Sequence, residues 1–318
     1  MKIAFLADPL ATFKIYKDST FAMMREAAAR GHTLYAFEQR HMALENGVVS
    51  AEVMEIALTG DSDEWYTIVG TSSVKLGEFD AIIERKDPPF DMEYVYLTQL
   101  LELAESQGAR VFNSPAAIRT HNEKLSIAQF SQFTSPTLVT SSESRLRAFH
   151  AEHGDVIFKP LDGMGGAGIF RIKDDGMNLG SVIETLTELG TRTIMAQKYI
   201  PAIVHGDKRV LVIDGKPIPF ALARIPQAGE VRGNLAAGGL GRAQPISERD
   251  REIAEALGPQ LAARGLLLVG LDIIGDYLTE VNVTSPTCFQ EIFDQTGYNV
   301  AATFIDAVEA QVNNRKQG

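Results

Sequence analysis

The chain has 318 residues, which is enough for roughly two domains at about 150 residues each. Apolar residues make up 45% and charged residues 22%, a globular composition that excludes a disordered or fibrous protein. The 30 basic and 41 acidic residues give a net charge of −11, which argues against nucleic acid or an anionic membrane as a partner.

The single cysteine, Cys288, excludes a disulfide framework and a cysteine-based zinc site. The N-terminal apolar run ends at Asp8, so it is too short for the core of a signal peptide or for a membrane span. We therefore expect a cytoplasmic protein that binds no membrane.

The first third of the chain alternates between strand and helix patterns. Ser19 is the expected N-terminal cap of the first helix, and Asn46-Gly47 indicates a β-hairpin. The expected strands cover residues 3–7, 33–37, 81–84 and 110–112, and the expected helices cover 19–30 and 91–106. This order is typical of a doubly wound α/β domain, which we place at residues 1–121.

The pattern changes after residue 121. Residues 122–200 combine expected strands at 137–139, 156–159, 169–172 and 193–199 with expected helices at 122–130, 143–152 and 179–189. Residues 201–318 hold expected strands at 209–213, 217–225, 267–274 and 277–283 and expected helices at 248–264 and 300–312. Residues 228–241 are rich in glycine and poor in apolar bulk, which predicts a mobile loop.

Residues 163–168 contain four glycines and match the pattern G-x-G-x-x-G. A dinucleotide-binding fingerprint requires a helix directly after the glycines, but residues 169–173 alternate as a strand does. A flap of two strands whose backbone amides close over phosphates fits better, with Lys159 placed to neutralise a phosphate. A plain glycine hairpin is the remaining alternative.

Oxygen-bearing side chains interrupt two apolar strand patterns near the C-terminus, Asp272 in the first and Glu280 and Asn282 in the second. Glu280 and Asn282 are two residues apart and share a strand face. If residues 275–277 form the loop, Ile274 pairs with Leu278 and Asp272 lies opposite Glu280. Such an all-oxygen set suits Mg²⁺ or Mn²⁺ that shares phosphate oxygens.

Two alternatives remain for this hairpin: a solvated sheet face, or carboxylates paired by Lys208 and Arg209. Arg209 and Arg224 lie within strand patterns, where a buried arginine indicates a carboxylate or phosphate partner. Lys124 could reach nucleotide phosphates, and Asp207, directly before a strand, could accept ribose hydroxyls.

These features occur in an order that resembles the ATP-grasp ligases: Lys124, Lys159, the glycine segment, residues 197–200, and Asp272, Glu280 and Asn282. Over essentially its whole length the chain resembles the bacterial glutathione synthetases, with the closest similarity at residues 85–91, 159–166, 233–239 and 279–287. The resemblance implies an N-terminal doubly wound α/β domain followed by a two-part ATP-grasp fold, with subdomains at 122–200 and 201–318.

The resemblance also implies an activity: ATP-dependent ligation of γ-glutamylcysteine and glycine through an acyl-phosphate, with two Mg²⁺ (or Mn²⁺) ions. The implied nucleotide-binding residues are Lys124, Lys159, Gly165, Gly166, Gln197, Lys198, Tyr199, Ile200 and Asp207, and the implied metal ligands are Asp272, Glu280 and Asn282. The implied substrate-binding residues are Lys17, Ser19, Arg85, Arg224, Asn234, Gly238, Gly239, Ser285 and Thr287. Arg209, Arg224 and Lys159 would take part in catalysis.

Loop 228–241 would then close as a lid over the intermediate. We expect an arginine directly after Gly239 in this family, whereas the chain has Leu240, so that Arg242 is the candidate to replace it. Two other functions stay open: another ATP-grasp carboxylate–amine ligase of the glutamate-adding or D-alanine–D-alanine type, and a non-catalytic nucleotide-binding scaffold. The resemblance also suggests a homo-oligomer.

Overall fold

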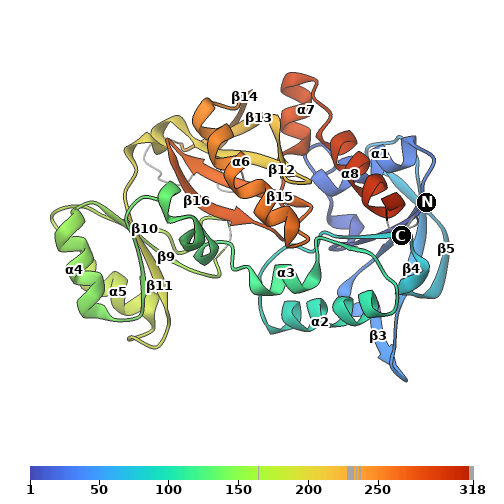
Figure 1. Cartoon of the computed structure of the whole chain (residues 1–318), viewed down its shortest axis with the longest axis horizontal. Helices are drawn as coiled ribbons and strands as arrows, with labels where there is room; N and C mark the ends of the chain where they lie inside the picture. The colour runs from blue at the N-terminus through green and yellow to red at the C-terminus, as the bar shows by residue number, and fades with distance from the viewer. Residues whose placement is uncertain (164, 228–232, 234, 236–237, 315–318) are drawn as a thin grey trace.

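The computed structural model describes residues 1–163, 165–227, 233, 235 and 238–314. Asn234 and residues 228–232 and 236–237 of the expected lid lie outside this description. Three sheets lie next to one another along the long axis of the molecule (Figure 1). In the ranges described, no helix is both long and apolar enough to cross a bilayer.

The N-terminal sheet, on the right of Figure 1, has the strand order β3-β4-β2-β1-β6-β7, and β5 pairs with β4. Strand β1 runs parallel to both β2 and β6, and β6 runs parallel to β7. The predicted doubly wound α/β fold is thereby confirmed. The strands are β1 (Lys2–Leu6), β2 (Thr33–Phe37), β3 (Met42–Glu45), β4 (Val48–Leu58), β5 (Tyr66–Lys75), β6 (Ala81–Glu84) and β7 (Val111–Phe112). The helices are α1 (Ser19–Ala29), α2 (Met92–Ser106) and α3 (Pro115–Thr120), with short 3-10 turns η1 (Leu10–Thr12), η2 (Gln39–His41) and η3 (Leu76–Glu78).

The cap of helix α1 differs from the prediction. Asp18 is the N-terminal cap, and its carboxylate accepts a hydrogen bond from the Phe21 amide at 2.7 Å. Ser19 lies inside the first turn, where its buried hydroxyl accepts a hydrogen bond from the Phe289 amide at 3.2 Å. The Ser19 side chain therefore joins two distant segments of the chain and does not cap its own helix.

The sequence prediction contains no counterpart of strand β5 or of two short helices. Strand β5 pairs with β4 and is exposed along most of its length, so its side chains do not alternate between buried and exposed. Helix α3 has six residues and helix α7 (Phe289–Thr296) has eight. Both helices are too short for a clear 3.6-residue apolar period.

The second sheet is antiparallel and lies at the left of Figure 1, with the strand order β10-β9-β11-β8. Its strands are β8 (Thr137–Thr140), β9 (Val156–Pro160), β10 (Phe170–Ile172) and β11 (Ile194–Lys198), and its helices are α4 (Glu143–His153) and α5 (Leu179–Thr187). One apolar cluster fills the space between this sheet and its helices, and it includes Leu146, Phe158 and Ile183. This part of the chain therefore has a core of its own.

The third sheet occupies the centre of Figure 1, with the antiparallel order β14-β13-β12-β15-β16. Its strands are β12 (Asp207–Ile213), β13 (Lys216–Ile225), β14 (Leu240–Pro245), β15 (Leu268–Ile274) and β16 (Tyr277–Asn282). The 3-10 segment η4 (Leu125–Phe133) packs against β16, and η5 (Pro201–His205) precedes β12. Helices α6 (Glu248–Ala263), α7 and α8 (Val300–Asn314) complete this part. Leu240 and Gly241, which we expected in the loop, belong instead to β14.

The first and third sheets share apolar core. One cluster contains Ile3 and Phe5 of β1 together with Leu211 of β12 and Phe304 and Val308 of α8. Helices α1 and α8 pack against each other in the same region. Separate sheets therefore lie before and after residue 121, but one apolar core includes residues from both sides of that point.

Candidate functional site

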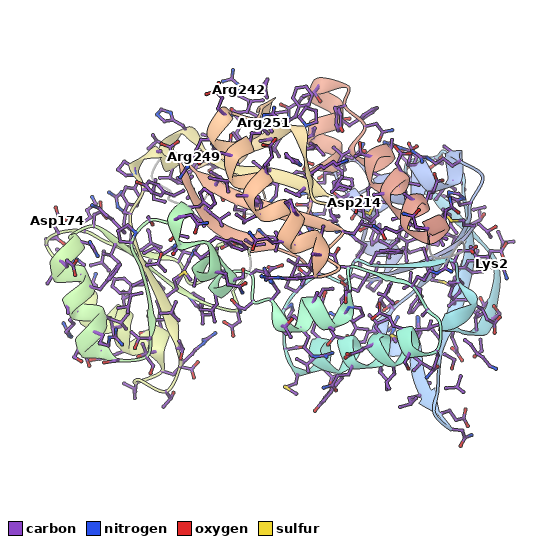
Figure 2. All side chains as sticks on the ribbon, in the orientation of Figure 1. Lys2, Asp174, Asp214, Arg242, Arg249 and Arg251 are labelled. Carbon is purple, nitrogen blue, oxygen red and sulfur yellow. The ribbon has the colours of Figure 1, made fainter. Side chains whose placement is uncertain are left out.

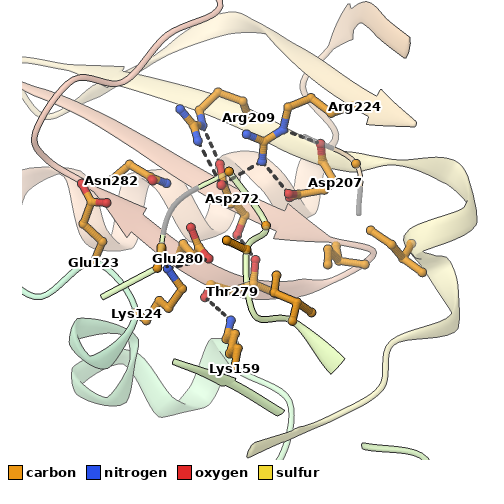
Figure 3. A pocket seen from close by; sticks show the side chains of 18 of the residues that line it. Glu123, Lys124, Lys159, Asp207, Arg209, Arg224, Asp272, Thr279, Glu280 and Asn282 are labelled. Atoms are coloured by element: carbon orange, nitrogen blue, oxygen red, sulfur yellow. Dashed lines mark hydrogen bonds and ion pairs between the residues drawn. The ribbon is translucent and has the colours of Figure 1, made fainter. Parts of the chain in front are cut away.

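A cavity of about 320 Å³ is lined by residues of the second and third sheets and of the segment that follows β6. Its wall comes from segments that are far apart in sequence, including Pro88, residues 197–200 and residues 284–288. The predicted site residues that line it are Lys124, Lys159, Gly165, Gly166, Gln197, Lys198, Tyr199, Ile200, Asp207, Arg209, Arg224, Asp272, Glu280, Asn282, Ser285 and Thr287. Folding thus gathers most of the expected site around one cavity (Figure 3).

The β15–β16 hairpin presents the oxygen-bearing side chains. Asp272 lies opposite Glu280, as expected. Ile274, however, pairs with Tyr277 and not with Leu278, because a β-bulge follows the Asp272–Glu280 pair. The bulged residue, Thr279, donates its hydroxyl to the Asp272 carbonyl at 3.0 Å. The two-residue turn and the extra residue compensate each other, so the two carboxylates still face one another.

Asp272 lies between two arginines. Arg209 binds it with Nε at 2.5 Å from Oδ1 and Nη2 at 3.0 Å from Oδ2, and Arg224 Nη2 lies 2.8 Å from Oδ2. Burial alone would raise the pKa of Asp272, but the two guanidinium groups hold it well below its usual range. Of the alternative in which Lys208 and Arg209 pair the carboxylates, the structure shows only the Arg209–Asp272 pair, because Lys208 pairs with Asp250 and Glu280 lies near Lys124.

Asp207 has one carboxylate oxygen that accepts no hydrogen bond from the described residues. Arg224 Nη2 donates to Oδ2 at 2.5 Å, while Oδ1 is buried without a hydrogen-bond partner among the described residues. Burial, opposed by Arg224 and reinforced by the nearby charges of Asp272 and Glu280, raises the pKa of Asp207 to about 7. A buried oxygen without a partner is costly, so Oδ1 is a natural acceptor for a hydroxyl of a bound molecule.

Two lysines face the hairpin from the opposite side of the cavity (Figure 3). Lys159 is buried, and within the described chain its ammonium has one hydrogen bond, to the Thr279 carbonyl at 3.4 Å. Burial lowers the pKa of Lys159. Lys124 Nζ donates to the Gly163 carbonyl and lies 3.4 Å from Glu280 Oε1. The cavity therefore holds a buried cation that has no carboxylate partner within salt-bridge distance in the described ranges.

Glu123 is a cavity residue that the sequence reasoning did not select. Its Oε1 accepts hydrogen bonds from the amides of Val283, at 2.8 Å, and Thr284, at 3.2 Å, and from the Thr284 hydroxyl at 3.0 Å. These bonds fix the segment that carries Lys124 beside the end of β16. The sequence offers one indication of this role: Glu123 directly precedes Lys124, which was already expected to bind phosphate.

Six of the expected residues that the structure describes do not line the cavity. Ser19 is occupied at the start of α1, and Lys17 is exposed, with its ammonium 5.8 Å from the Tyr16 ring. Arg85 lies behind the wall, where Nη2 donates to the Pro286 carbonyl at 3.0 Å. Arg242 is exposed on β14, at the outer edge of the molecule in Figure 2, so it does not replace the expected arginine in this conformation. Gly238 and Gly239 also lie outside the lining.

Glu84, next to Arg85, predicts a pH dependence of stability. Burial raises its pKa to about 8, against hydrogen bonds from the Lys86 amide at 2.8 Å and the Tyr94 hydroxyl at 3.1 Å and against the charge of Arg85. Between about pH 4.5 and pH 8, Glu84 keeps its proton in the folded protein. In the unfolded chain, with the ordinary pKa of 4.5, it has lost that proton. The free energy of unfolding therefore falls as pH rises from about 4.5 to about 8, with a slope of up to about 1.4 kcal/mol per pH unit.

Glu84→Gln removes this titration, so we expect a flatter dependence of unfolding free energy on pH between about 5 and 8. Urea unfolding at several pH values measures the slope. Glu78→Gln, an exposed carboxylate just before the same strand, should keep the slope of the original chain. Equal slopes for the original chain and Glu84→Gln would contradict the assignment.

Family models match nearly the whole chain: the prokaryotic glutathione synthetase N-terminal domain at residues 1–119 and the prokaryotic glutathione synthetase ATP-grasp domain at residues 123–297. A glutathione synthetase of Ralstonia nicotianae is 67% identical over 318 residues, covering 100% of this chain and 98% of that protein. The chain belongs to the prokaryotic glutathione synthetase family.

Solved structures support the fold of this glutathione synthetase family member. The crystal structure of D-cycloserine synthetase DcsG has a TM-score of 0.69 at 18% identity and covers 98% of this chain and 99% of that chain. The ATP-grasp ligase PsnB, in a complex with minimal precursor, Mg and ADP, has a TM-score of 0.62 at 20% identity and covers 98% of each chain. The expected ATP-grasp fold is confirmed.

Proposed function

We propose that the chain joins γ-glutamylcysteine to glycine at the cavity, with ATP as the energy source, and releases glutathione, ADP and phosphate. One observation carries the proposal: two lysines, two arginines and the oxygen-bearing hairpin converge on a single cavity in a glutathione synthetase family chain. Cys288 also lines the cavity, but burial raises the pKa of its thiol, which makes it a poor nucleophile. The chemistry therefore depends on alignment and charge, as phosphoryl transfer requires.

The nucleotide would occupy the end of the cavity between the second and third sheets. Lys124 and Lys159 would contact phosphates, the backbone at Gly165 and Gly166 would approach them, and the free Asp207 Oδ1 would accept a ribose hydroxyl. Residues 197–200 would hold the base beside apolar side chains. The apolar side chains at that end are Ile157, Ile203 and Ile274.

The residues present fit a divalent cation that shares its coordination with bound phosphates. Asn282 donates its amide nitrogen to the Gly270 carbonyl at 3.1 Å, which leaves the amide oxygen for a ligand. In the described ranges, no group of three or more His, Cys, Asp and Glu residues is placed to hold a metal alone. Glu280 and Asn282, with Asp272, would hold the two Mg²⁺ or Mn²⁺ ions that we propose. When bound, such ions neutralise negative charge on the transferring phosphoryl group.

Arg209 and Arg224 would bind the substrate carboxylate and then the acyl-phosphate, and Ser285 and Thr287 would contact the dipeptide. In the first step a carboxylate oxygen of γ-glutamylcysteine attacks the γ-phosphorus of ATP, and the bond to the β-phosphate oxygen breaks to release ADP. In the second, the glycine amine attacks the acyl carbon, loses a proton, and phosphate leaves. The segment around Gly238 and Gly239 would exclude water, which otherwise hydrolyses the intermediate.

Phosphate release tests the proposal against the other ligase types. We expect release from ATP with γ-glutamylcysteine plus glycine, and little release with D-alanine alone or with glutamate as the added amino acid. The amount of glutathione formed should equal the amount of phosphate released. Preferred release with another acid–amine pair would assign another ligase activity, and nucleotide binding without release under any condition would assign a scaffold.

We also propose that the reaction takes place in the reducing cytoplasm, in which the lone thiol stays reduced, and that the chain self-associates. Sedimentation velocity measures the second point. A single species of about 35 kDa at micromolar concentration would contradict self-association, since one chain has a mass of 34.7 kDa.

A further inference from the structure

Arg171 stacks on the ring of Tyr199. The guanidinium carbon of Arg171 lies 3.5 Å from the centroid of the Tyr199 ring. This separation is that of a guanidinium lying flat against an aromatic face, and it is far shorter than the 6 Å or so that limits a cation–π contact. Arg171 lies in β10, the strand that follows the glycine segment, and Tyr199 directly follows β11.

Asp155 holds both members of this stack. Its carboxylate accepts two hydrogen bonds from Arg171, with Nε at 2.8 Å from Oδ1 and Nη2 at 2.5 Å from Oδ2. Its carbonyl accepts a hydrogen bond from the Tyr199 amide at 2.9 Å. The bidentate pair fixes the plane of the guanidinium group, and the backbone bond fixes the position of the ring. Two parts of the same residue thus set the geometry of the stack.

Tyr199 lines the cavity at the end assigned to the nucleotide base, whereas Arg171 does not line it. The Arg171 side chain is 26% exposed and that of Asp155 is 30% exposed, so the pair lies at the outer surface of the second sheet. The cation therefore contacts Tyr199 from behind the cavity wall. An ion pair that is partly accessible to solvent adds little stability by itself, but this one is positioned to restrict an aromatic side chain of the site.

We propose that Arg171 is a positioning residue for the nucleotide base: it fixes the Tyr199 ring and so links the strand after the glycine segment to the base end of the cavity. The proposal rests on the proposed nucleotide site. The stack should raise the affinity for the nucleotide, because it pre-organises the part of the wall that the base contacts. We expect no direct effect on the chemical step, since Arg171 does not line the cavity.

Titration calorimetry with ADP and Mg²⁺, without the amino-acid substrates, tests this inference. Arg171→Met should weaken ADP binding about tenfold and raise the KM for ATP by a similar factor, with kcat within about twofold. Arg171→Lys should recover part of the loss, because it keeps the charge but not the planar fork. Arg147→Met removes a surface pair with Glu143 in the same part of the molecule and should change neither value.

A double-mutant cycle with Tyr199→Leu separates positioning from a general effect on folding. In the Tyr199→Leu background, Arg171→Met should have almost no further effect on ADP binding. Equal losses in both backgrounds, a fall in kcat without a change in KM, or unchanged ADP binding in Arg171→Met would each overturn the inference. Thermal unfolding shows whether each variant is folded. If Arg171→Met is not folded, Arg171→Lys takes its place in the cycle.

The two proposals fail in different ways. If the original chain releases phosphate with γ-glutamylcysteine and glycine but Arg171→Met binds ADP normally, only the positioning role is lost. If the original chain binds no adenine nucleotide, both the proposed function and the positioning role are lost.

Discussion

Replacement of Glu280 by glutamine is expected to lower kcat of the proposed ligase by about a thousandfold while the chain remains folded. Glu280 contacts Lys124 at 3.4 Å and faces Asp272 across the β15–β16 hairpin. Glutamine keeps the shape but removes the negative charge that a divalent cation requires at that point. Asn282→Ala, which removes an uncharged oxygen from the same strand face, should have a smaller effect of the same kind.

Steady-state phosphate release at saturating substrates measures this effect, and raising the Mg²⁺ concentration should recover part of the lost rate. Asp276→Asn is the matched control, since it makes the same change from carboxylate to amide at the exposed turn of the hairpin. It should turn over like the original chain. If Glu280→Gln turned over as fast as the unmodified protein, the proposed metal-binding role of this hairpin would be contradicted.

Lys159→Met is expected to lower kcat/KM for ATP by two to three orders of magnitude, or roughly 3–4 kcal/mol of transition-state stabilisation. The same substitution should leave the free energy of unfolding unchanged or raise it by about 1 kcal/mol. The reason is that Lys159 is 4% exposed and has one long hydrogen bond, to Thr279, in the described chain. Its charge is thus placed for an anionic ligand and not for the stability of the empty protein.

Lys208→Met provides the opposite case. Lys208 pairs with Asp250, which is 0% exposed, and its loss leaves a buried carboxylate without its cation. We expect the free energy of unfolding to fall by about 3 kcal/mol. Urea unfolding of both variants measures whether each substitution raises or lowers the free energy of unfolding. A large loss of stability in Lys159→Met would mean that the ammonium is satisfied within the protein, which would contradict its proposed role.

The sequence identified the carboxylate hairpin because alternation assigns side chains to a face. It could not locate the bulge at Thr279, because a bulge leaves the local pattern unchanged and depends on the pairing partner. The sequence left open whether Arg209 pairs with a carboxylate, and it did not place Arg224 beside the same aspartate. Both pairs follow from the register of β12 with its neighbours: β15 places Asp272 opposite Arg209, 63 positions away in sequence, and β13 brings Arg224 to the same side.

Ser19 shows a different limit. Its place before a helical pattern predicted a cap, but Asp18 is an equally good cap one position earlier. Tertiary structure decided between them, since the Ser19 hydroxyl contacts Phe289 at the start of α7, itself a helix with no clear apolar period. The dipeptide contacts expected of Lys17, Ser19 and Arg85 stay predictions.

The shared core of the first and third sheets has a consequence for synthesis on the ribosome. Phe304 and Val308 of α8 complete the apolar layer around β1, and Arg30, after α1, binds Asp306 at 2.6 Å. Strand β1 therefore lacks these packing partners until α8 has been translated. During synthesis, the region around β1 stays incompletely packed until the segment up to α8 has been made. Stalled or prematurely terminated products should accordingly be good substrates for chaperones and proteases.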